Sequence, residues 1–407
     1  MWLVLVFVSL AFFAAHALYF SARLRGALAL VVPRSRRWLG PLRAAYLVIA
    51  LSLPVLLLGY TVYALVARPE TIGPPDSRLY DLVIELPFWL VTITSLQCSL
   101  LIVPIDLVHL GLARFGIAAG ERWRRRRALL VLAIAAVCAI YVPVRMAMDA
   151  RSLEVRVHDL ASPTLPAALD GLEIALIADM QADQYTGPER LSQLVDAANR
   201  ARPDLVLIAG DMITRAPRFI ELAARETARL VAPRGVLACI GDHDNFAYRD
   251  RERSLREVRD ALARHGIPML DNQVRELRVG DAAIAIVFAT NNYVSRIDRD
   301  TTRRLLEQAA GADFRILLAH QPSEALIADA RAGRIDLFLA GHTHGGQINF
   351  WLPFLDLTPA RIENRYITGS FRLGDMLLVV SSGLGMSVAP FRYRAPATLD
   401  LVRLHRR

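Results

Sequence analysis

Side chains that can bind metal ions occur in five clusters in the second half of the chain. Each cluster directly follows a short apolar run, and together the clusters contain Asp179, Gln181, Asp211, Asp242, His243, Asp244, His320, His342 and His344. Carboxylate oxygens and imidazole nitrogens together suit divalent ions such as Mn, Fe, Zn or Co. Two such ions about 3.5–4 Å apart can clamp the attacking and leaving oxygens of a phosphoryl displacement. The residue types therefore indicate a two-metal site suited to phosphoryl chemistry.

The apolar runs before these clusters have the pattern of buried β-strands, and amphipathic helical patterns alternate with them. Strands are expected at 153–157, 173–178, 205–209, 236–240, 283–289, 315–319, 336–340, 376–381 and 398–404. Helices are expected near 188–201, 217–231, 253–265, 300–310 and 323–333. Ligand sites in α/β proteins form outside the carboxyl ends of strands. A single Asp after a strand is usually a helix cap, but five polar clusters at strand ends predict one shared site.

The five clusters follow one another in a recognisable order. They read Asp-x-Gln, Gly-Asp, Gly-Asp-His-Asp, His and Gly-His-Thr-His, from Asp179 to His344. This series resembles the calcineurin-like metallophosphoesterases, in particular their membrane-associated subgroup of the YkuE and YaeI type. The likeness covers roughly residues 150–405 and includes the stretches 341–348 and 382–387. The resemblance implies an α/β fold, namely a two-sheet sandwich flanked by helices, and activity as a metal-dependent phosphoric ester hydrolase.

The same resemblance, carried over position by position, implies a ligand set for two divalent ions. Its members are Asp179, Gln181, Asp211, Asp242, His320, His342 and His344. Asp211 would bridge both ions. Asp179 and His344 would bind one ion, and His320 and His342 the other. A water activated by these metals would attack the phosphoester.

The resemblance also implies two catalytic residues, His243 and Asp244. His243 would donate a proton to the leaving oxygen, and Asp244 would orient its imidazole. Asn245, Arg392 and Arg394 could contact phosphate, since the guanidinium fork matches phosphate oxygens. In so Arg-rich a chain, however, a given arginine is more often a solvated surface residue.

Two positions depart from the family pattern. Gln181 stands where the family has His, and Asp242 stands where it has Asn. Both changes move the site from nitrogen toward oxygen ligands, which favours Mn, with Mg, Fe, Zn and Co as alternatives. The other interpretation is that one ion is held loosely or lost. Asp183 could then act as a substitute ligand, although a solvated loop acid is the commoner role.

The chemistry of the site is compatible with more than one class of substrate. Phosphomonoesters and phosphodiesters both suit a two-metal centre, and a lipid-linked phosphoester is a further candidate because of the chain's membrane part. The alternative function is a catalytically impaired membrane sensor or scaffold with this fold. Retention of His243, Asp244 and the full Gly-His-Thr-His block argues against that alternative.

The first 150 residues have the composition of a membrane domain. The chain is 54% hydrophobic, and the excess lies in four long apolar segments. Each is long enough for a helix that crosses a bilayer, which needs about 20 apolar residues. Transmembrane helices are expected at about 2–21, 44–67, 87–112 and 128–148. Residues 1–150 would thus be a membrane domain and residues 151–407 a phosphoesterase domain.

Charge predicts how these helices are oriented. The net charge is +9, and the excess comes from arginines in 22–43 and 113–127, beside apolar segments. By the positive-inside rule both stretches are cytoplasmic. Arginines follow the first apolar segment rather than precede it, so we expect a retained helix and not a signal peptide. The phosphoesterase domain would then lie outside the cytoplasm, on a multi-pass protein of the inner membrane. This charge distribution indicates a lipid bilayer as partner and no nucleic acid.

Overall fold

The computed structural model describes residues 2–71, 73, 77–117, 120–387 and 389–407. The chain divides into two compact units. The helical unit contains Met1–Arg68, Pro74–Met148 and Phe350–Leu357, and the globular unit contains Pro69–Gly73, Asp149–Asn349 and Thr358–Arg407. The short segment Phe350–Leu357 therefore belongs to the helical unit, although it lies far along the sequence.

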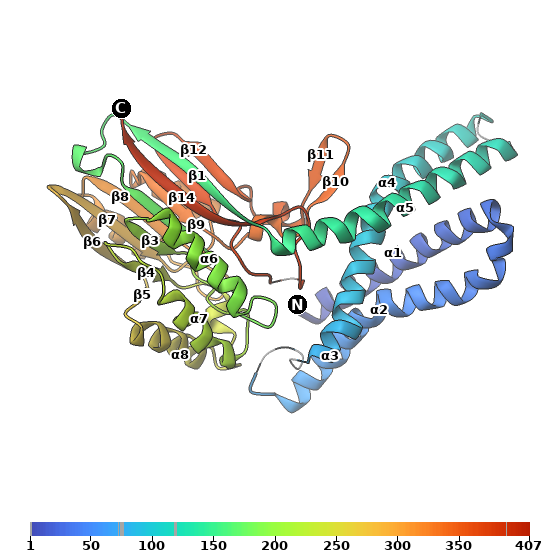
Figure 1. Ribbon diagram of the computed structural model, residues 1–407, viewed down its shortest axis with the longest axis horizontal. Coiled ribbons are helices and arrows are strands. Elements are labelled where there is room, and N and C mark those ends of the chain that lie inside the picture. Colours follow the sequence, from blue (N-terminus) through green and yellow to red (C-terminus); the bar gives the residue numbers. More distant parts are fainter. Residues whose placement is uncertain (1, 72, 74–76, 118–119, 388) are drawn as a thin grey trace. The chain divides into compact units, whose positions relative to one another are not determined.

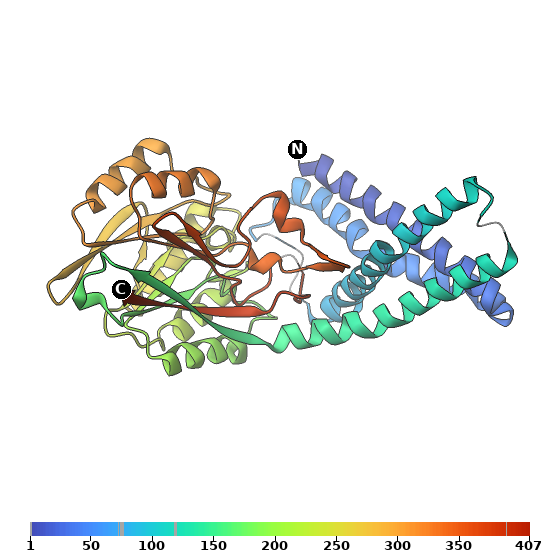
Figure 2. The same cartoon turned by 90° about the horizontal axis from the view of Figure 1, so that it is seen from above.

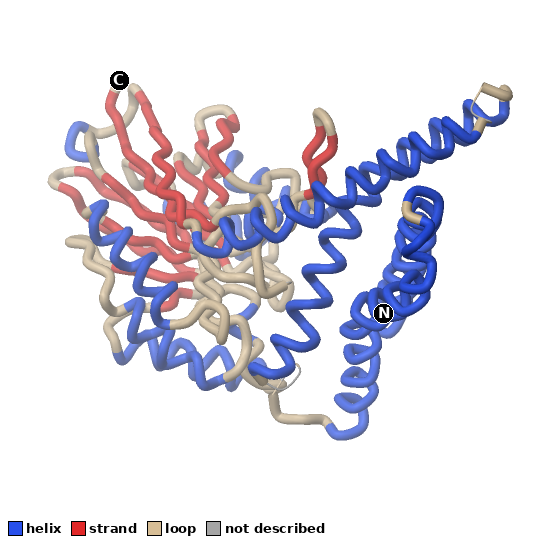
Figure 3. The backbone as a smooth tube through the Cα atoms, turned by 45° about the vertical axis from the view of Figure 1, so that its right-hand side comes forward, coloured by secondary structure: helices blue, strands red, loops and turns tan. Residues whose placement is uncertain are grey.

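Long helices make up most of the helical unit (Figure 3). They are α1 (Trp2–Val31), α2 (Arg36–Ala67), α3 (Arg78–Tyr80), a π-helical turn (Asp81–Glu85), α4 (Leu86–Arg114) and α5 (Glu121–Arg151). Four stretches are long and apolar enough to cross a membrane: Phe7–Val31, Arg36–Ala67, Arg78–Arg114 and Glu121–Arg151. This finding confirms the prediction of four long apolar helices before the globular part.

The helices continue past the apolar segments into the arginine-rich flanks. Arg23 in α1 donates to Asp106 in α4 through Nε at 2.5 Å and Nη2 at 2.6 Å. Such a two-pronged bond satisfies both charges. α1 extends to Val31, beyond the end expected near residue 21.

The globular unit is built on two six-stranded sheets (Figure 1). In the first sheet the order is β1 (Leu153–Ser162), β14 (Ala397–Arg406), β2 (Glu173–Ile177), β3 (Leu205–Ile208), β4 (Val236–Cys239) and β5 (Met269–Leu270). In the second the order is β12 (Gly369–Leu373), β13 (Met376–Val380), β9 (Leu337–Ala340), β8 (Phe314–Ala319), β7 (Ala282–Ala289) and β6 (Gln273–Val279). The predicted two-sheet architecture is confirmed.

Helices cover the outer face of both sheets (Figure 2). The first sheet packs against α6 (Pro188–Ala201), α7 (Ile220–Thr227) and α8 (Arg251–Arg264), and the second against α9 (Arg299–Ala309) and α10 (Glu324–Ala332). Successive residues of a strand point to opposite faces. Leu207 accordingly faces the core between the sheets, while Val206 faces the helices. Burial of both faces explains why the central strands are continuous apolar runs.

Parallel pairing gathers the ends of the central strands. β2, β3 and β4 run parallel in one sheet, and β7, β8 and β9 in the other. Three residues just beyond these strands have positive φ, namely Asp179 (48°), Asp211 (59°) and His342 (74°). A positive φ is rare for residues other than glycine and reverses the chain direction sharply. The strand ends therefore turn at once into the loops that carry the predicted metal ligands.

Candidate metal centre

Tight backbone contacts fix the loops that carry the site residues. Gly210 has φ +79°, and a Cβ there would lie 2.4 Å from the backbone N of Gly241. A Cβ on Gly241 would in turn lie 2.1 Å from Oδ1 of Asp211. Only glycine fits these two positions, so the loops after β3 and β4 can touch each other. Asp211 and Asp242 are brought into one site by this contact.

Six of the seven predicted ligands form two groups of close donor atoms. The Asp179 group consists of Asp179, Asp211 and His344, and the His320 group consists of Asp242, His320 and His342. Within each group the donor atoms all lie within 4.8 Å of one another. The division matches the one implied by the family resemblance, with Asp211 placed on the side of Asp179.

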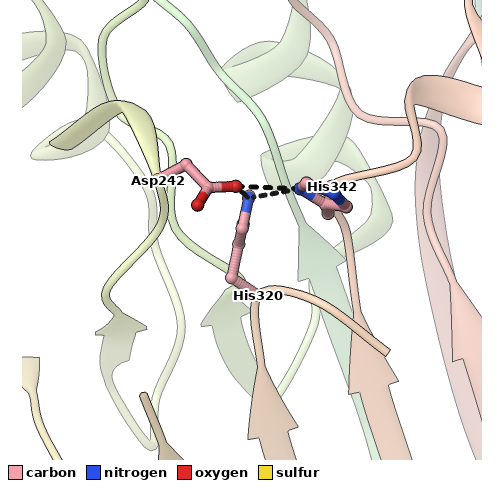
Figure 4. A group of neighbouring side chains, drawn as sticks. All are labelled: Asp242, His320 and His342. Atoms are coloured by element: carbon pink, nitrogen blue, oxygen red, sulfur yellow. Dashed lines mark hydrogen bonds and ion pairs between the residues drawn. The ribbon is translucent and has the colours of Figure 1, made fainter. Parts of the chain in front are cut away.

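The His320 group converges from three different loops (Figure 4). Oδ2 of Asp242 lies 3.0 Å from Nδ1 of His342 and 3.3 Å from Nε2 of His320. Nδ1 of His320 lies 2.7 Å from the carbonyl oxygen of Ala209. Because a carbonyl oxygen only accepts hydrogen bonds, Nδ1 carries the hydrogen, and Nε2 is available to bind a metal ion. One possible ligand atom from each of the three residues therefore lies close to the other two.

The Asp179 group is enclosed. Nε2 of His344 lies 3.6 Å from Oδ1 of Asp179, and both residues are buried. Asp179 also accepts from the backbone N of His342, at 3.0 Å to Oδ2. Oδ2 of Asp211 lies 3.4 Å from Nε2 of His320, so Asp211 approaches both groups. This position fits a bridging carboxylate.

Gln181, the seventh predicted ligand, is fully buried beside Asp211. Its Nε2 donates to Oδ2 of Asp211 at 3.1 Å. Its Oε1 is buried without a hydrogen-bond partner among the described residues. A buried polar oxygen without a partner is costly, and a cation beside it would remove that cost. The orphaned oxygen and the donor set therefore fit divalent metal ions.

Burial and crowded charge shift the pKa values of the site in different directions. Burial raises the pKa of Asp179 to about 6 and lowers the pKa of His344 well below its usual range. Burial also acts to lower the pKa of His320, but the carboxylates of Asp211 and Asp242 raise it well above its ordinary value. The raised pKa of His320 shows that the carboxylates around it give the site an excess of negative charge. A metal ion bound there would neutralise this charge.

The expected partnership of His243 and Asp244 requires a correction. Nδ1 of His243 lies 2.6 Å from the carbonyl oxygen of Thr214. Asp244 instead accepts from the backbone N of Asp211, Met212 and Gly241, at 3.1, 2.8 and 2.8 Å. The described residues show no bond between Asp244 and the His243 ring. Asp244 therefore shapes the turn that carries Asp211, because three amides saturate its carboxylate.

A cavity of about 350 Å³ adjoins both groups. Its wall includes Asp211, Asp242, His243, His342 and His344. Since the His243 ring lines this wall beside the ligands, it can reach a molecule bound there.

Two further cavity residues escaped the sequence analysis. The backbone N of Tyr293 donates to Oδ1 of Asp242 at 2.5 Å, and the Tyr293 ring packs edge-on against His342. Oε1 of Glu363 lies 3.6 Å from Nε2 of His342 and accepts from Nε2 of Gln321 at 2.5 Å. Both residues lie in loops that contain no recognisable sequence motif, so the sequence alone did not indicate that they belong to the cavity.

Three of the secondary candidates have structural roles. Arg392 is 1% exposed and donates to the carbonyl oxygens of His344, Ala395, Ser382, Gly383 and Gly385. Asn245 donates to the carbonyl oxygens of Gly241 and Asp242. Asp183 is buried and accepts from Tyr185, Thr186 and Thr214. Asp183 is thus neither a solvated acid nor a free ligand, because its oxygens hold a turn.

The fold and the two candidate ligand groups can be compared with known proteins. A family model described as calcineurin-like phosphoesterase matches residues 172–346. These residues, which contain all seven predicted metal ligands, are therefore similar to calcineurin-like phosphoesterases.

Two relatives and one solved structure illustrate the similarity. The uncharacterized metallophosphoesterase YkuE of Bacillus subtilis is 28% identical over 262 residues, which cover 63% of this chain and 87% of the relative. A Danio rerio transmembrane protein with metallophosphoesterase domain is 28% identical over 282 residues, 66% of this chain and 60% of its own length. Among solved structures, the NAD nucleotidase of Haemophilus influenzae aligns over 52% of this chain and 50% of its own, with 18% identity and a TM-score of 0.36. Candidate metal ligands and four helices long and apolar enough to cross a membrane thus occur together in this chain, and the Danio rerio relative is named a transmembrane protein.

Proposed function

We propose that this protein is a membrane-anchored hydrolase of phosphoesters with a two-metal centre. The observation that carries the proposal is the pair of ligand groups beside one cavity, linked through Asp211. The ligands would be Asp179, Gln181, Asp211, Asp242, His320, His342 and His344. The ions would be Mn by preference, with Mg, Fe, Zn and Co as alternatives. When bound, the two ions supply Lewis acidity and an activated water.

His243 is the proposed proton donor to the leaving oxygen. Its Nδ1 faces the Thr214 carbonyl, which only accepts, so Nδ1 keeps its hydrogen in either protonation state. The exchangeable proton is therefore on Nε2. The ring lines the cavity, where a leaving group would lie. Asp244 acts as a positioning residue for the Asp211 turn.

The proposal extends to location and substrate. Residues 1–150 would anchor the protein in the inner membrane, and residues 151–407 would lie outside the cytoplasm. Monoesters, diesters and lipid-linked phosphoesters are the candidate substrates, and we expect no nucleic-acid binding. A reporter that is active only outside the cytoplasm, fused after Arg407, should be active. Activity of a cytoplasm-only reporter at that position would reverse the orientation.

Hydrolysis of chromogenic substrates by the purified full chain tests the activity itself. We expect metal-dependent release of p-nitrophenol from a mono- or diester, strongest with Mn. Activity should disappear with a chelator and return when the metal is restored. Absence of hydrolysis with Mn, Mg, Zn, Fe and Co would instead favour the alternative of an impaired sensor or scaffold.

A further inference from the structure

A loop without a recognisable motif carries Glu363 to the wall of the metal cavity. Glu363 directly follows the short 3-10 turn Pro359–Ile362. Gly346 has φ +86°, and a Cβ there would clash with Oγ1 of Thr358, the residue before this turn. Glycine at this position therefore lets the turn lie against the loop that carries His342.

The carboxylate of Glu363 faces the outer nitrogen of the His342 ring. Nδ1 of His342 lies 3.0 Å from Oδ2 of Asp242 and 3.2 Å from Nε2 of His320 (Figure 4). Nε2, on the other side of the ring, lies 3.6 Å from Oε1 of Glu363. Nδ1 is therefore the nitrogen that faces the other ligands, and Nε2 is the one that faces Glu363.

Glu363 is charged and is itself held by two donors. The hydrogen bond with His342 lowers the pKa of Glu363 below its ordinary value, although burial acts to raise it. Nε2 of Gln321 donates to Oε1 of Glu363 at 2.5 Å. Burial and a hydrogen bond to Glu363 raise the pKa of the Tyr293 hydroxyl. Because a carboxylate only accepts hydrogen bonds, Glu363 favours the form of His342 that carries its hydrogen on Nε2.

Tyr293 and Gln321 also connect Glu363 to the other ligands of this group. The ring of Tyr293 packs edge-on against His342, with 4.9 Å between the ring centroids. The backbone N of Tyr293 donates to Oδ1 of Asp242 at 2.5 Å. Gln321 directly follows the third ligand in the chain. Glu363 and its two donors therefore contact or adjoin every member of the group.

His342 differs in this respect from the other two histidines of the site. Nδ1 of His320 lies 2.7 Å from the carbonyl oxygen of Ala209, and Nδ1 of His344 lies 3.3 Å from that of Gly385. Their outer nitrogens thus face backbone, whereas the outer nitrogen of His342 faces a charged side chain. A carboxylate in this position fixes the orientation of a metal-binding imidazole and makes it more basic.

We propose that Glu363 is a positioning residue for one of the two metal ions. Held by Tyr293 and Gln321, it keeps the hydrogen of His342 on Nε2 and directs Nδ1 toward the ion that the His320 group would bind. The other ion does not depend on it. The proposal rests on the proposed two-metal function and adds the residues that set the affinity of one site alone.

Titration of the metal-free full chain with Mn, followed by calorimetry, tests the proposal one site at a time. A His344→Ala background leaves the other ligand group as the metal site, and a His342→Ala background leaves the group that contains His344. Glu363→Gln, which removes the charge and keeps the shape, is added to each background. Glu307→Gln, at an exposed position of α9, is the matched control.

Glu363→Gln should weaken Mn binding about 10- to 100-fold in the His344→Ala background, because loss of a carboxylate behind a ligand has an effect of that size. In the His342→Ala background it should leave the dissociation constant unchanged. Glu307→Gln should match its parent in both backgrounds. Equal losses in the two backgrounds would indicate a general structural role and would overturn the proposal, as would the absence of a loss in either.

Electron paramagnetic resonance gives a second readout in the chain without background substitutions. With two Mn ions supplied per chain, the wild type should give the exchange-coupled spectrum of a bridged pair. Glu363→Gln should give mainly the spectrum of an isolated ion, because one site then fills poorly. A coupled spectrum of wild-type intensity in Glu363→Gln would contradict the proposal. If the wild type binds fewer than two Mn ions at saturation, the proposed two-metal function fails instead.

Discussion

The two candidate ligand groups of the metal centre differ in burial and in charge. The residues of the Asp179 group are all buried, and desolvation lowers the pKa of His344 well below its ordinary value. The His320 group faces the cavity through His342, and Asp242 lies between its two imidazoles, whose pKa values are raised. His344 can therefore bind a metal ion without releasing a proton, whereas the imidazoles of the His320 group must exchange protons for the ion. Both groups contribute residues to the wall of the cavity.

Asp211→Asn should have the largest effect, because this carboxylate approaches both groups. Loss of its charge should weaken the binding of both metal ions and reduce hydrolysis below detection. Asp196→Asn is a matched control, since Asp196 lies on the surface beside Arg229. The measurement is the rate with a saturating chromogenic ester. Wild-type activity in Asp211→Asn would remove this residue from the site.

His243→Asn should spare both ligand groups and slow the chemistry. General-acid catalysis contributes roughly 100- to 10,000-fold, so turnover on an ester with a poor leaving group should fall within that range. Metal content should remain at the wild-type level. His265→Asn, on the surface beside Glu221, serves as the control. Unchanged turnover would show that His243 does not donate the proton.

The stability of the metal-free protein should depend on pH in a direction set by the site. Burial raises the pKa of Asp179 and of Asp244 to about 6, above the ordinary carboxyl value of about 4. At these two carboxyls the folded state binds more protons than the unfolded state between these pH values. The lowered pKa of His344 acts in the opposite direction, but at one site against two, so stability falls as pH rises from about 4 to 6. The raised pKa of His320 extends the decline above pH 6.5.

Thermal unfolding of the chelated full chain measures this trend. The midpoint should be higher at pH 5 than at pH 7.5, and added Mn should stabilise the protein most at the higher pH. Metal ions compete with protons for the same atoms. A midpoint that rises with pH in the chelated protein would contradict the assignment of buried, protonated site residues.

A change in metal preference is the smallest expected effect and separates the two groups. Gln181→His returns an imidazole to the Asp179 group, and Asp242→Asn removes a charge from the His320 group. The double variant should move the preference from Mn or Mg toward Zn or Fe. The same preference and activity in wild type and double variant would show that neither side chain reaches an ion.

The sequence predicted the central part of the fold well. The nine expected strands are all present. The central ones are apolar runs covered on both faces, whereas β1 is an edge strand with exposed residues. The sequence did not predict β5, β6, β12 or the hairpin formed by β10 (Phe350–Leu352) and β11 (Leu355–Leu357). β6 (Gln273–Val279) is an edge strand paired only with β7, and charged side chains occupy its exposed positions. The hairpin depends on Gln97, about 250 residues earlier in the chain, so no local pattern could reveal it.

The part of the site that was predictable consists of residues whose side-chain type indicates metal binding. Asp and His clusters at strand ends predicted the two ligand groups, because parallel strands bring their ends together. The partner of His243 is a backbone carbonyl of Thr214, which sequence does not mark. The approach of Glu363 to His342 likewise depends on how a loop without a motif folds back.

Metal stoichiometry tests the two-group account most directly. Purified full chain, equilibrated with Mn and freed of excess, is analysed by mass spectrometry of the metal, as wild type and as His344→Ala and His342→Ala. We predict two ions per wild-type chain and one in each variant. One ion in the wild type, or an unchanged count in both variants, would contradict two separate metal-binding groups in this protein.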